Sequence, residues 1–164
     1  MNAARGALAA AAGLCLLQAL RAYQMLPNTV ASHFGPSGHP DSYAPKTAFL
    51  GLYAGVVLFL SLMMVMTARS IGAQPDTRIN LPNKDYWLAP GRRQATIDAI
   101  GTYMAWFGAA TNLLLFDVFG QAIRVNLRLS ERLDHPKVSL GVYLAFALVW
   151  TVAFTRRFAK TGGG

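Results

Sequence analysis

Long uncharged apolar runs restrict most strongly how this chain can fold. Residues 48–68, 99–116 and 138–155 each lack any charged side chain. A helix of about 18 or more apolar residues crosses the hydrocarbon core of a bilayer. A fourth run, residues 6–26, is rich in Ala and Leu, although its second half holds polar residues. The sequence therefore predicts an all-α integral membrane protein, a single domain of residues 1–164 with four transmembrane helices in a bundle, at about 6–26, 48–68, 97–119 and 138–155.

Composition and charge placement favour a membrane protein over a soluble or nucleic-acid-binding one. Hydrophobic residues make up 54% of the 164 residues and charged residues 13%, about half of the usual share in soluble domains. The net charge is +8, but the Lys and Arg residues stand at the ends of the apolar runs rather than along one polar face. The single cysteine, Cys15, excludes an intrachain disulfide and a cysteine metal cluster. We therefore expect a lipid bilayer as partner and no nucleic acid.

The first apolar run has two interpretations. Arg5 followed by apolar residues is typical of a cleaved signal peptide, but Leu20, Arg21 and Tyr23 occupy the place of a small-residue cleavage site. A retained helix is therefore favoured. With four helices, nine Lys and Arg residues fall on the side of the termini and five on the other side, which predicts cytoplasmic termini.

The connections between the spans differ in composition. Residues 27–46 hold four prolines and two glycines, which predicts an ordered, turn-rich outer loop. Residues 69–93 form a longer inner loop that mixes charge with aromatic rings, which predicts an interfacial segment before the third helix. The residues expected at the lipid headgroups are Lys84, Tyr86, Trp87, Arg92 and Arg93.

Glycines in two of the spans predict close helix packing. Gly51 and Gly55 form a GxxxG pair one turn apart, and Gly108 lies among small residues of the third span. Such residues let two helix backbones approach closely in a membrane. We favour packing within one bundle, with a homo-oligomer contact as the alternative.

Ionisable residues inside membrane spans are costly and are usually paired. Arg21 in the first span and Asp117 in the third fall at a similar outer level if the termini are cytoplasmic. The sequence thus predicts an intramembrane polar pair of these two residues, with Gln18, Gln24 and Asn112 beside it. The alternative is that Arg21 reaches the headgroups and Asp117 is the water-exposed end of its helix.

The outer loop holds residues that could bind a metal. His33, His39 and Asp41 supply two imidazoles and a carboxylate, a donor set that zinc or copper accepts. Their spacing lacks the fixed pattern of metal motifs, so histidines that serve the loop fold, or a pH-sensitive hydrogen-bond cluster, are the favoured alternative. No cofactor is predicted.

Three arginines with a spacing of four follow the third span: Arg124, Arg128 and Arg132. If the helix continues beyond the bilayer, they form a basic stripe that could hold anionic headgroups or an acidic partner. A solvated helix end is slightly favoured over that role.

No arrangement of a nucleophile and a base, and no phosphate-binding loop, is recognisable in the sequence. Asp98 and Asp117 bound the uncharged part of the third span, but 19 residues separate them, about 28 Å along a helix. They cannot act in one site, and we expect no enzymatic activity.

The segment after the first span resembles a known bacterial domain. The domain of unknown function that opens SdpI-type membrane proteins is similar to this chain at residues 26–34 (LPNTVASHF), at residues 38–41 (GHPD) and at a lysine that starts a span. Residues 80–90 (NLPNKDYWLAP) resemble a block found in stand-alone members. The resemblance covers residues 20–70, and the matching outer-loop residues are His33, Phe34, Gly38, His39, Pro40, Asp41 and Lys46.

The resemblance implies a small multi-pass protein of the bacterial cytoplasmic (inner) membrane. The family prototype confers immunity to a secreted toxic peptide and relays its presence to a membrane-sequestered repressor. We therefore expect a non-enzymatic, SdpI-like protein of immunity or signalling type that binds a peptide, protein or lipid partner at its outer face. The alternatives are a small accessory subunit of a larger membrane complex and, third, a metal-handling or transport protein.

Overall fold

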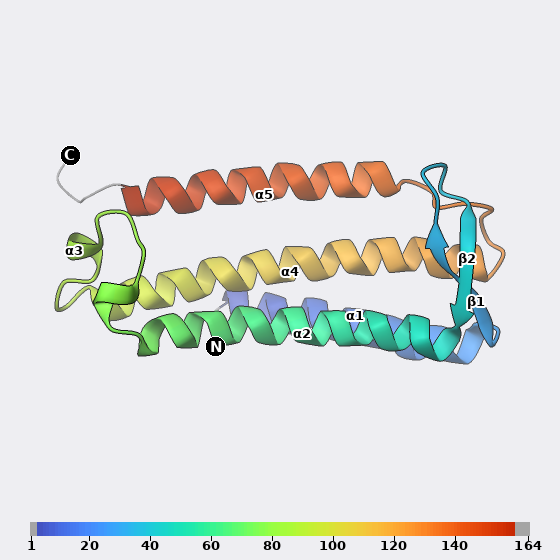
Figure 1. Cartoon of the computed structure of the whole chain (residues 1–164), viewed down its shortest axis with the longest axis horizontal. Coiled ribbons are helices and arrows are strands. Elements are labelled where there is room, and N and C mark those ends of the chain that lie inside the picture. The colour runs from blue at the N-terminus through green and yellow to red at the C-terminus, as the bar shows by residue number, and fades with distance from the viewer. Residues whose placement is uncertain (1–2, 160–164) are drawn as a thin grey trace.

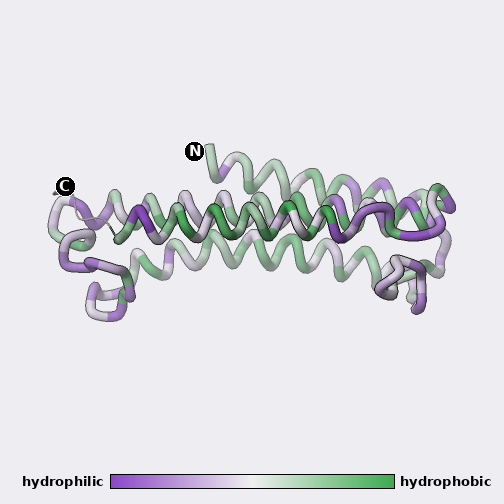
Figure 2. Tube along the Cα trace, turned by 90° about the horizontal axis from the view of Figure 1, so that it is seen from above, coloured by the Kyte–Doolittle hydropathy of each residue, from purple (hydrophilic) through white to green (hydrophobic). Residues whose placement is uncertain are grey.

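Four long helices run side by side in the computed structural model, which describes residues 3–159 (Figure 1). All four are long and apolar enough to cross a membrane, so the prediction of four transmembrane helices is confirmed. Hydrophobic residues are concentrated along the middle of the helices and hydrophilic residues gather at both ends (Figure 2). The chain is thus a multi-pass membrane protein. The helices are α1 (Ala3–Met25), α2 (Lys46–Ala73), α4 (Arg93–Asn126) and α5 (Pro136–Ala159).

Three helices, α2, α4 and α5, reach past the predicted spans at both ends, whereas α1 begins three residues earlier and ends one residue earlier than predicted. The longest, α4, has 34 residues, which extend over about 51 Å, whereas the hydrocarbon core of a bilayer is about 30 Å thick. An uncharged run marks only the part of a helix that lies in hydrocarbon. It therefore underestimates the length of a helix whose ends continue into the headgroups and water.

The centre of the bundle is α4. The helices α1 and α2 pack against it and against each other, whereas α5 packs chiefly against α4 and stands apart from the other two (Figure 1). Within α5, only Phe158 near its end is buried. Rings of α4 and α5 contact each other, as Phe107 and Trp150 do, and Trp150 Nε1 donates a hydrogen bond to the Tyr103 carbonyl at 2.9 Å. The bundle is therefore a packed set of three helices with α5 held on one side.

A set of polar contacts crosses the core of the three packed helices. Tyr53 of α2 is fully buried, and its hydroxyl donates to Gln18 Oε1 of α1 at 2.7 Å. Gln18 Nε2 donates to the Phe116 carbonyl of α4 at 3.1 Å. Asn112 Nδ2 of α4 donates to Ser61 Oγ of α2 at 2.9 Å. Gln18 and Asn112 therefore connect the helices to one another instead of surrounding a charged pair.

The glycines expected to pack helices differ in their surroundings. A Cβ built on Gly108 would lie 2.8 Å from Met64 Cγ and 3.0 Å from Leu8 Cδ1, so this glycine permits the close approach of α1, α2 and α4. The prediction for Gly108 is confirmed. A Cβ on Gly51 or Gly55 would meet nothing within 4 Å, because both residues face the outside of α2. The prediction that Gly51 and Gly55 pack within the bundle is therefore wrong.

The connection between α1 and α2 is a two-stranded antiparallel hairpin, β1 (Thr29–Phe34) and β2 (Pro40–Pro45). Its turn, Gly35-Pro36-Ser37-Gly38, is closed by a hydrogen bond from the Gly38 N–H to the Gly35 carbonyl at 2.8 Å. Gly38 has a φ of +83°, a conformation that favours glycine, and Pro36 suits the second position of such a turn. The expected ordered, turn-rich loop between the first two helices is confirmed, but it contains two strands where an all-α chain was predicted.

The segment between α2 and α4 covers the ends of two helices. Arg93 donates to two carbonyls at the end of α2, and Trp87 Nε1 donates to the Phe158 carbonyl at the end of α5 at 2.9 Å. The Arg92 guanidinium lies 4.0 Å from the centre of the Tyr86 ring. A position of these side chains at the lipid headgroups stays a prediction. The segment includes the 3-10 helix η1 (Asp76–Arg78) and the short helix α3 (Lys84–Trp87).

The prediction that Arg124, Arg128 and Arg132 form a basic stripe is wrong, because α4 ends two residues before Arg128. Arg128 has a φ of +59°, and the N–H groups of Arg128 and Leu129 bond back to the Val125 and Arg124 carbonyls, both at 2.9 Å. This pair of bonds is the Schellman ending of a helix, in which the left-handed residue is usually glycine. Arg132 lies in the irregular connection that follows, so the three arginines share no helix face.

Replacement of Arg128 by glycine is expected to raise the free energy of unfolding by up to about 1 kcal/mol, because glycine adopts a positive φ without the clash that a Cβ causes. Thermal unfolding of the detergent-solubilised protein measures the change. Arg132→Gly removes the same charge at a position without positive φ and serves as the control. Equal loss of stability in both variants would contradict the prediction.

Candidate functional site

The two ends of the bundle differ in structure (Figure 1). We call the end that carries β1 and β2 the hairpin end, and the end that carries the first turn of α1 the terminal end. At the hairpin end, the β-hairpin, the last turns of α4 and the connection to α5 form one surface. The residues that resemble the outer-loop motif and the expected polar residue Asp117 all lie at this end.

The hairpin is fixed to the bundle by side chains from α4 and from the connection that follows. Asn126 Oδ1 accepts from the Ala31 N–H at 2.6 Å, and Asn126 Nδ2 donates to the Ala31 carbonyl at 3.0 Å, as a neighbouring strand would. The Leu133 N–H donates to the Gly38 carbonyl at the hairpin turn at 2.9 Å. Phe34 packs against the buried cluster of the bundle. These contacts make the hairpin an ordered part of the surface.

Lys46 joins the end of α1 to the start of α2. Its ammonium group donates to the Leu26 and Tyr23 carbonyls at 3.0 and 3.1 Å and lies 4.9 Å from the centre of the Tyr23 ring. The last carbonyls of a helix lack partners within the helix, so Lys46 caps α1. Among the motif residues, Phe34, Gly38 and Lys46 thus maintain the shape of the hairpin end.

The two histidines of the hairpin are not equivalent. His33 Nδ1 lies 2.5 Å from Asp41 Oδ1 across the strands, and the two side chains are 71% and 48% exposed. His39 is exposed and has no part in this pair. Within residues 3–159, no three His, Cys, Asp or Glu side chains come together to hold a metal. The structure therefore joins two of the three residues considered for zinc or copper and leaves a solvent-facing imidazole–carboxylate pair.

The predicted pair of Arg21 and Asp117 is wrong. Arg21 is exposed on α1, and the ion pairs among the described residues do not include it. Because Gln18 of α1 contacts the Phe116 carbonyl, this turn of α4 meets α1 at Phe116. The next residue of a helix points about 100° away, so Asp117 faces α5 instead.

Asp117 is the centre of a polar cluster between α4 and α5. Its Oδ2 accepts from Ser139 Oγ at 2.5 Å and from Gln121 Nε2 at 2.7 Å, and its Oδ1 lies 3.5 Å from His135 Nε2. Gln121 Oε1 also accepts from the His135 N–H at 3.0 Å, where α5 begins. The cluster thus holds the start of α5 on α4 and keeps one carboxylate at the boundary of the apolar span.

An open groove of about 450 Å³ runs from this cluster along α4 and α5. Asp117, His135 and Ser139 form its polar end. The Tyr143 hydroxyl lies in the groove and shares a hydrogen bond with Thr111 Oγ1 at 2.9 Å. The rest of the lining is apolar, namely Ala110, Leu113, Leu114, Val138, Val142 and Phe146. Such a groove suits an elongated apolar ligand with a cationic or hydrogen-bonding group at one end.

The sequence identified Asp117 but missed His135, Ser139 and Gln121. A signal for them was present, because Pro136 suits the first position of a helix and thereby places His135 at the start of the last helix. That start lies at the same end of the bundle as Asp117. A search for polar residues at the matching ends of sequential helices would have found the cluster.

The connection from α4 to α5 has its own polar contacts. Ser130 Oγ donates to Asp134 Oδ1 at 2.8 Å, and Arg124 Nε donates to Asp134 Oδ2 at 3.2 Å. The Ser130 hydroxyl first, and the Arg124 guanidinium second, hold the pKa of Asp134 below its ordinary value. The stabilisation that this carboxylate supplies is therefore present above its ordinary pKa and is lost as the pH falls through the lowered value.

The fold defines a multi-pass membrane protein. Residues 10–65 match the family described as a domain of unknown function (DUF1648). This segment contains most of α1, the β-hairpin and most of α2, so it includes the His33–Asp41 pair but not the α4–α5 groove. No curated protein and no solved structure matches the chain.

Proposed function

We propose that this chain is a non-enzymatic, SdpI-like membrane protein of immunity or signalling type that binds an apolar peptide in the groove between α4 and α5. The observation that carries the proposal is the apolar groove with a carboxylate, an imidazole and a hydroxyl at its hairpin end. The resemblance of the outer-loop residues to SdpI-type proteins and the family match of residues 10–65 support the same class.

We further propose that the hairpin end faces the cell exterior of a bacterial cytoplasmic membrane. Basic residues are more numerous on the side of the termini, as the cytoplasmic side of a membrane protein requires. A secreted peptide would then meet the β-hairpin and the polar end of the groove first. The exposed His33–Asp41 pair would form part of this entrance.

In the proposed mechanism, apolar side chains of the peptide lie against Val138, Val142 and Phe146, and an ammonium or amide group of the peptide donates to Asp117. Since α5 packs chiefly against α4, a ligand between these two helices can shift α5 without disturbing the three packed helices. Binding would then shift the population between two placements of α5 relative to α4, and this shift would also move the other end of α5.

A photocrosslinker in the groove tests the proposal. Val142 and Val149 of α5 are both 67% exposed, but only Val142 lines the groove. A benzophenone amino acid at position 142, in cells that make the protein, is expected to capture a peptide, and the same group at position 149 is not. Mass spectrometry of the crosslinked product identifies what was captured.

Asp117→Asn is expected to reduce the yield of that crosslinked peptide about tenfold or more, because it removes the charge that a cationic group meets. Asp98→Asn, the same change at the other end of α4, is the matched control and should leave the yield unchanged. Capture of lipid alone at position 142, or equal yields in the two variants, would refute peptide binding in this groove.

An accessory subunit of a larger membrane complex is the second proposal. The supporting observation is the outward face of α2, where Gly51 and Gly55 are exposed. A Cβ built on either glycine would meet no atom of the described chain within 4 Å. Small residues on a helix face admit a neighbouring helix. Purification in mild detergent of a second protein at fixed stoichiometry would favour this proposal over a peptide receptor.

A further inference from the structure

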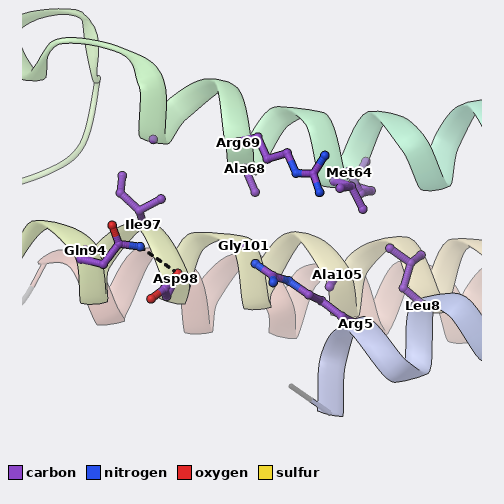
Figure 3. A pocket seen from close by; sticks show the side chains of 12 residues that line it. Arg5, Leu8, Met64, Ala68, Arg69, Gln94, Ile97, Asp98, Gly101 and Ala105 are labelled. Atoms are coloured by element: carbon purple, nitrogen blue, oxygen red, sulfur yellow. Dashed lines mark hydrogen bonds between the residues drawn. The ribbon is translucent and has the colours of Figure 1, made fainter. Parts of the chain in front are cut away.

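A second hollow, of about 350 Å³, lies at the terminal end between α1, α2 and α4 (Figure 3). It lies beside the first turns of α1, and α2 and α4 extend past these turns (Figure 1). A Cβ built on Gly101 would lie 3.4 Å from Ala68 Cβ, and one on Gly72 would lie 3.2 Å from Ile97 Cγ2. The approach of α2 to α4 at these two points bounds the hollow.

Three charged side chains line the hollow, one from each helix. Arg5 comes from α1, Arg69 from α2 and Asp98 from α4, which leaves an excess of one positive charge. Figure 3 shows Arg69 lying along α2 and Arg5 reaching from α1 across α4, with the Arg5 guanidinium beside Gly101. Asp98 Oδ1 accepts from Gln94 Nε2 at 3.2 Å. Among the described residues, Arg69 has no hydrogen-bond, ion-pair or ring partner.

The hollow lies at the level of lipid headgroups. Asp98 and Asp117 are separated by 19 residues of α4, about 28 Å, which matches the thickness of about 30 Å for the hydrocarbon core. The uncharged part of α4 lies between them, so each carboxylate marks one boundary of the hydrocarbon. Since Asp98 lines the hollow, the hollow opens at the boundary of the terminal end.

We propose that the hollow binds the headgroup of an anionic phospholipid, with its phosphate between Arg5 and Arg69. A guanidinium donates two parallel hydrogen bonds to a phosphate, and basic pockets between transmembrane helices hold such headgroups. Asp98 can accept from a hydroxyl of the headgroup, such as the terminal glycerol of phosphatidylglycerol. The apolar lining by Leu8 and Met64 accommodates the start of the acyl chains.

This lipid site does not depend on the proposed peptide groove, because the two lie at opposite ends of α4 and share no residue. Its occupant would connect the first turns of α1 to α2 and α4 at the cytoplasmic surface in the proposed orientation.

Native mass spectrometry of the detergent-solubilised full chain tests the assignment. Phosphatidylglycerol and phosphatidylcholine with identical acyl chains are added at equal concentrations, and the ratio of the two bound lipids is measured. We expect the wild-type protein to prefer phosphatidylglycerol about five- to tenfold. Arg69→Gln should reduce this preference to about twofold or less, and Arg69→Lys should retain part of it.

Arg78→Gln is the matched control, because it removes the same charge at the terminal end outside the hollow. Circular dichroism verifies that all variants keep their helices. Equal preferences in the wild type and Arg69→Gln, or the same loss in Arg78→Gln, would overturn the site. Inorganic phosphate in excess should leave phosphatidylglycerol bound, and its displacement would overturn the assignment to a lipid in favour of a free anion.

Discussion

Replacement of Gly108 by leucine is expected to lower the free energy of unfolding by about 3 kcal/mol or more. A Cβ at this position would already lie 2.8 Å from Met64 Cγ and 3.0 Å from Leu8 Cδ1, closer than carbon atoms pack. Leucine adds three further carbons at the point where α4 meets both α1 and α2. Leu8 is only 4% exposed and Met64 is partly buried, so both side chains must leave their packed positions to admit the new atoms.

Gly51→Leu is the matched control for this prediction. A Cβ on Gly51 meets nothing within 4 Å, and the residue faces the outside of α2, so the change should alter stability by about 0.5 kcal/mol or less. Unfolding of both variants by sodium dodecyl sulfate in mixed micelles, followed by circular dichroism, measures the difference. Similar losses for the two glycines would show that α1, α2 and α4 do not approach one another as described.

The four helices could be predicted because charge is expensive in hydrocarbon and every uncharged run of sufficient length must be buried in lipid or protein. The turn in the first loop followed from local chemistry in the same way, since Gly35, Pro36 and Gly38 favour a turn, but the two strands that flank it were not predicted. The end of α4 did not follow, because Arg128 occupies a left-handed position that glycine usually takes. Its spacing from Arg124 suggested a continuing helix that the backbone does not form.

The face of a helix that packs could not be predicted from spacing alone. Gly51 and Gly55 have the spacing of a packing motif, yet the larger face of α2 with Tyr53 and Val57 is the one that is buried. A small residue gains contact area only where the neighbouring helix lies, and long-range packing decides that direction.

The candidate site was predicted only in part, because the direction in which a helix residue faces does not follow from its sequence position. Asp117 was recognisable as a carboxylate at the end of an apolar span, but its partner was assigned by depth in the membrane alone. Residues at equal depth on different helices meet only if they also face each other, and Asp117 faces His135 and Ser139 rather than Arg21. Depth follows from sequence position at 1.5 Å per residue, whereas the facing direction depends on the packing of the whole bundle.

Replacement of Asn126 by leucine is expected to release the hairpin and to lower the free energy of unfolding by about 2–4 kcal/mol. Asn126 is the hydrogen-bond partner of both the N–H and the carbonyl of Ala31, at 2.6 and 3.0 Å. Ala31 is 3% exposed, so water cannot easily replace the lost partner. Each buried backbone group without a partner costs about 1–3 kcal/mol.

Hydrogen–deuterium exchange separates the release of the hairpin from global unfolding. The amide of Ala31 should exchange much faster in Asn126→Leu, while the amides in the middle of α4 keep their protection. Asn28→Leu changes an exposed residue of the same type just before β1 and should leave the Ala31 amide protected. If Asn126→Leu left the exchange of Ala31 unchanged, the hairpin would be held by Phe34 and the Leu133–Gly38 bond without the pairing of Asn126 with Ala31.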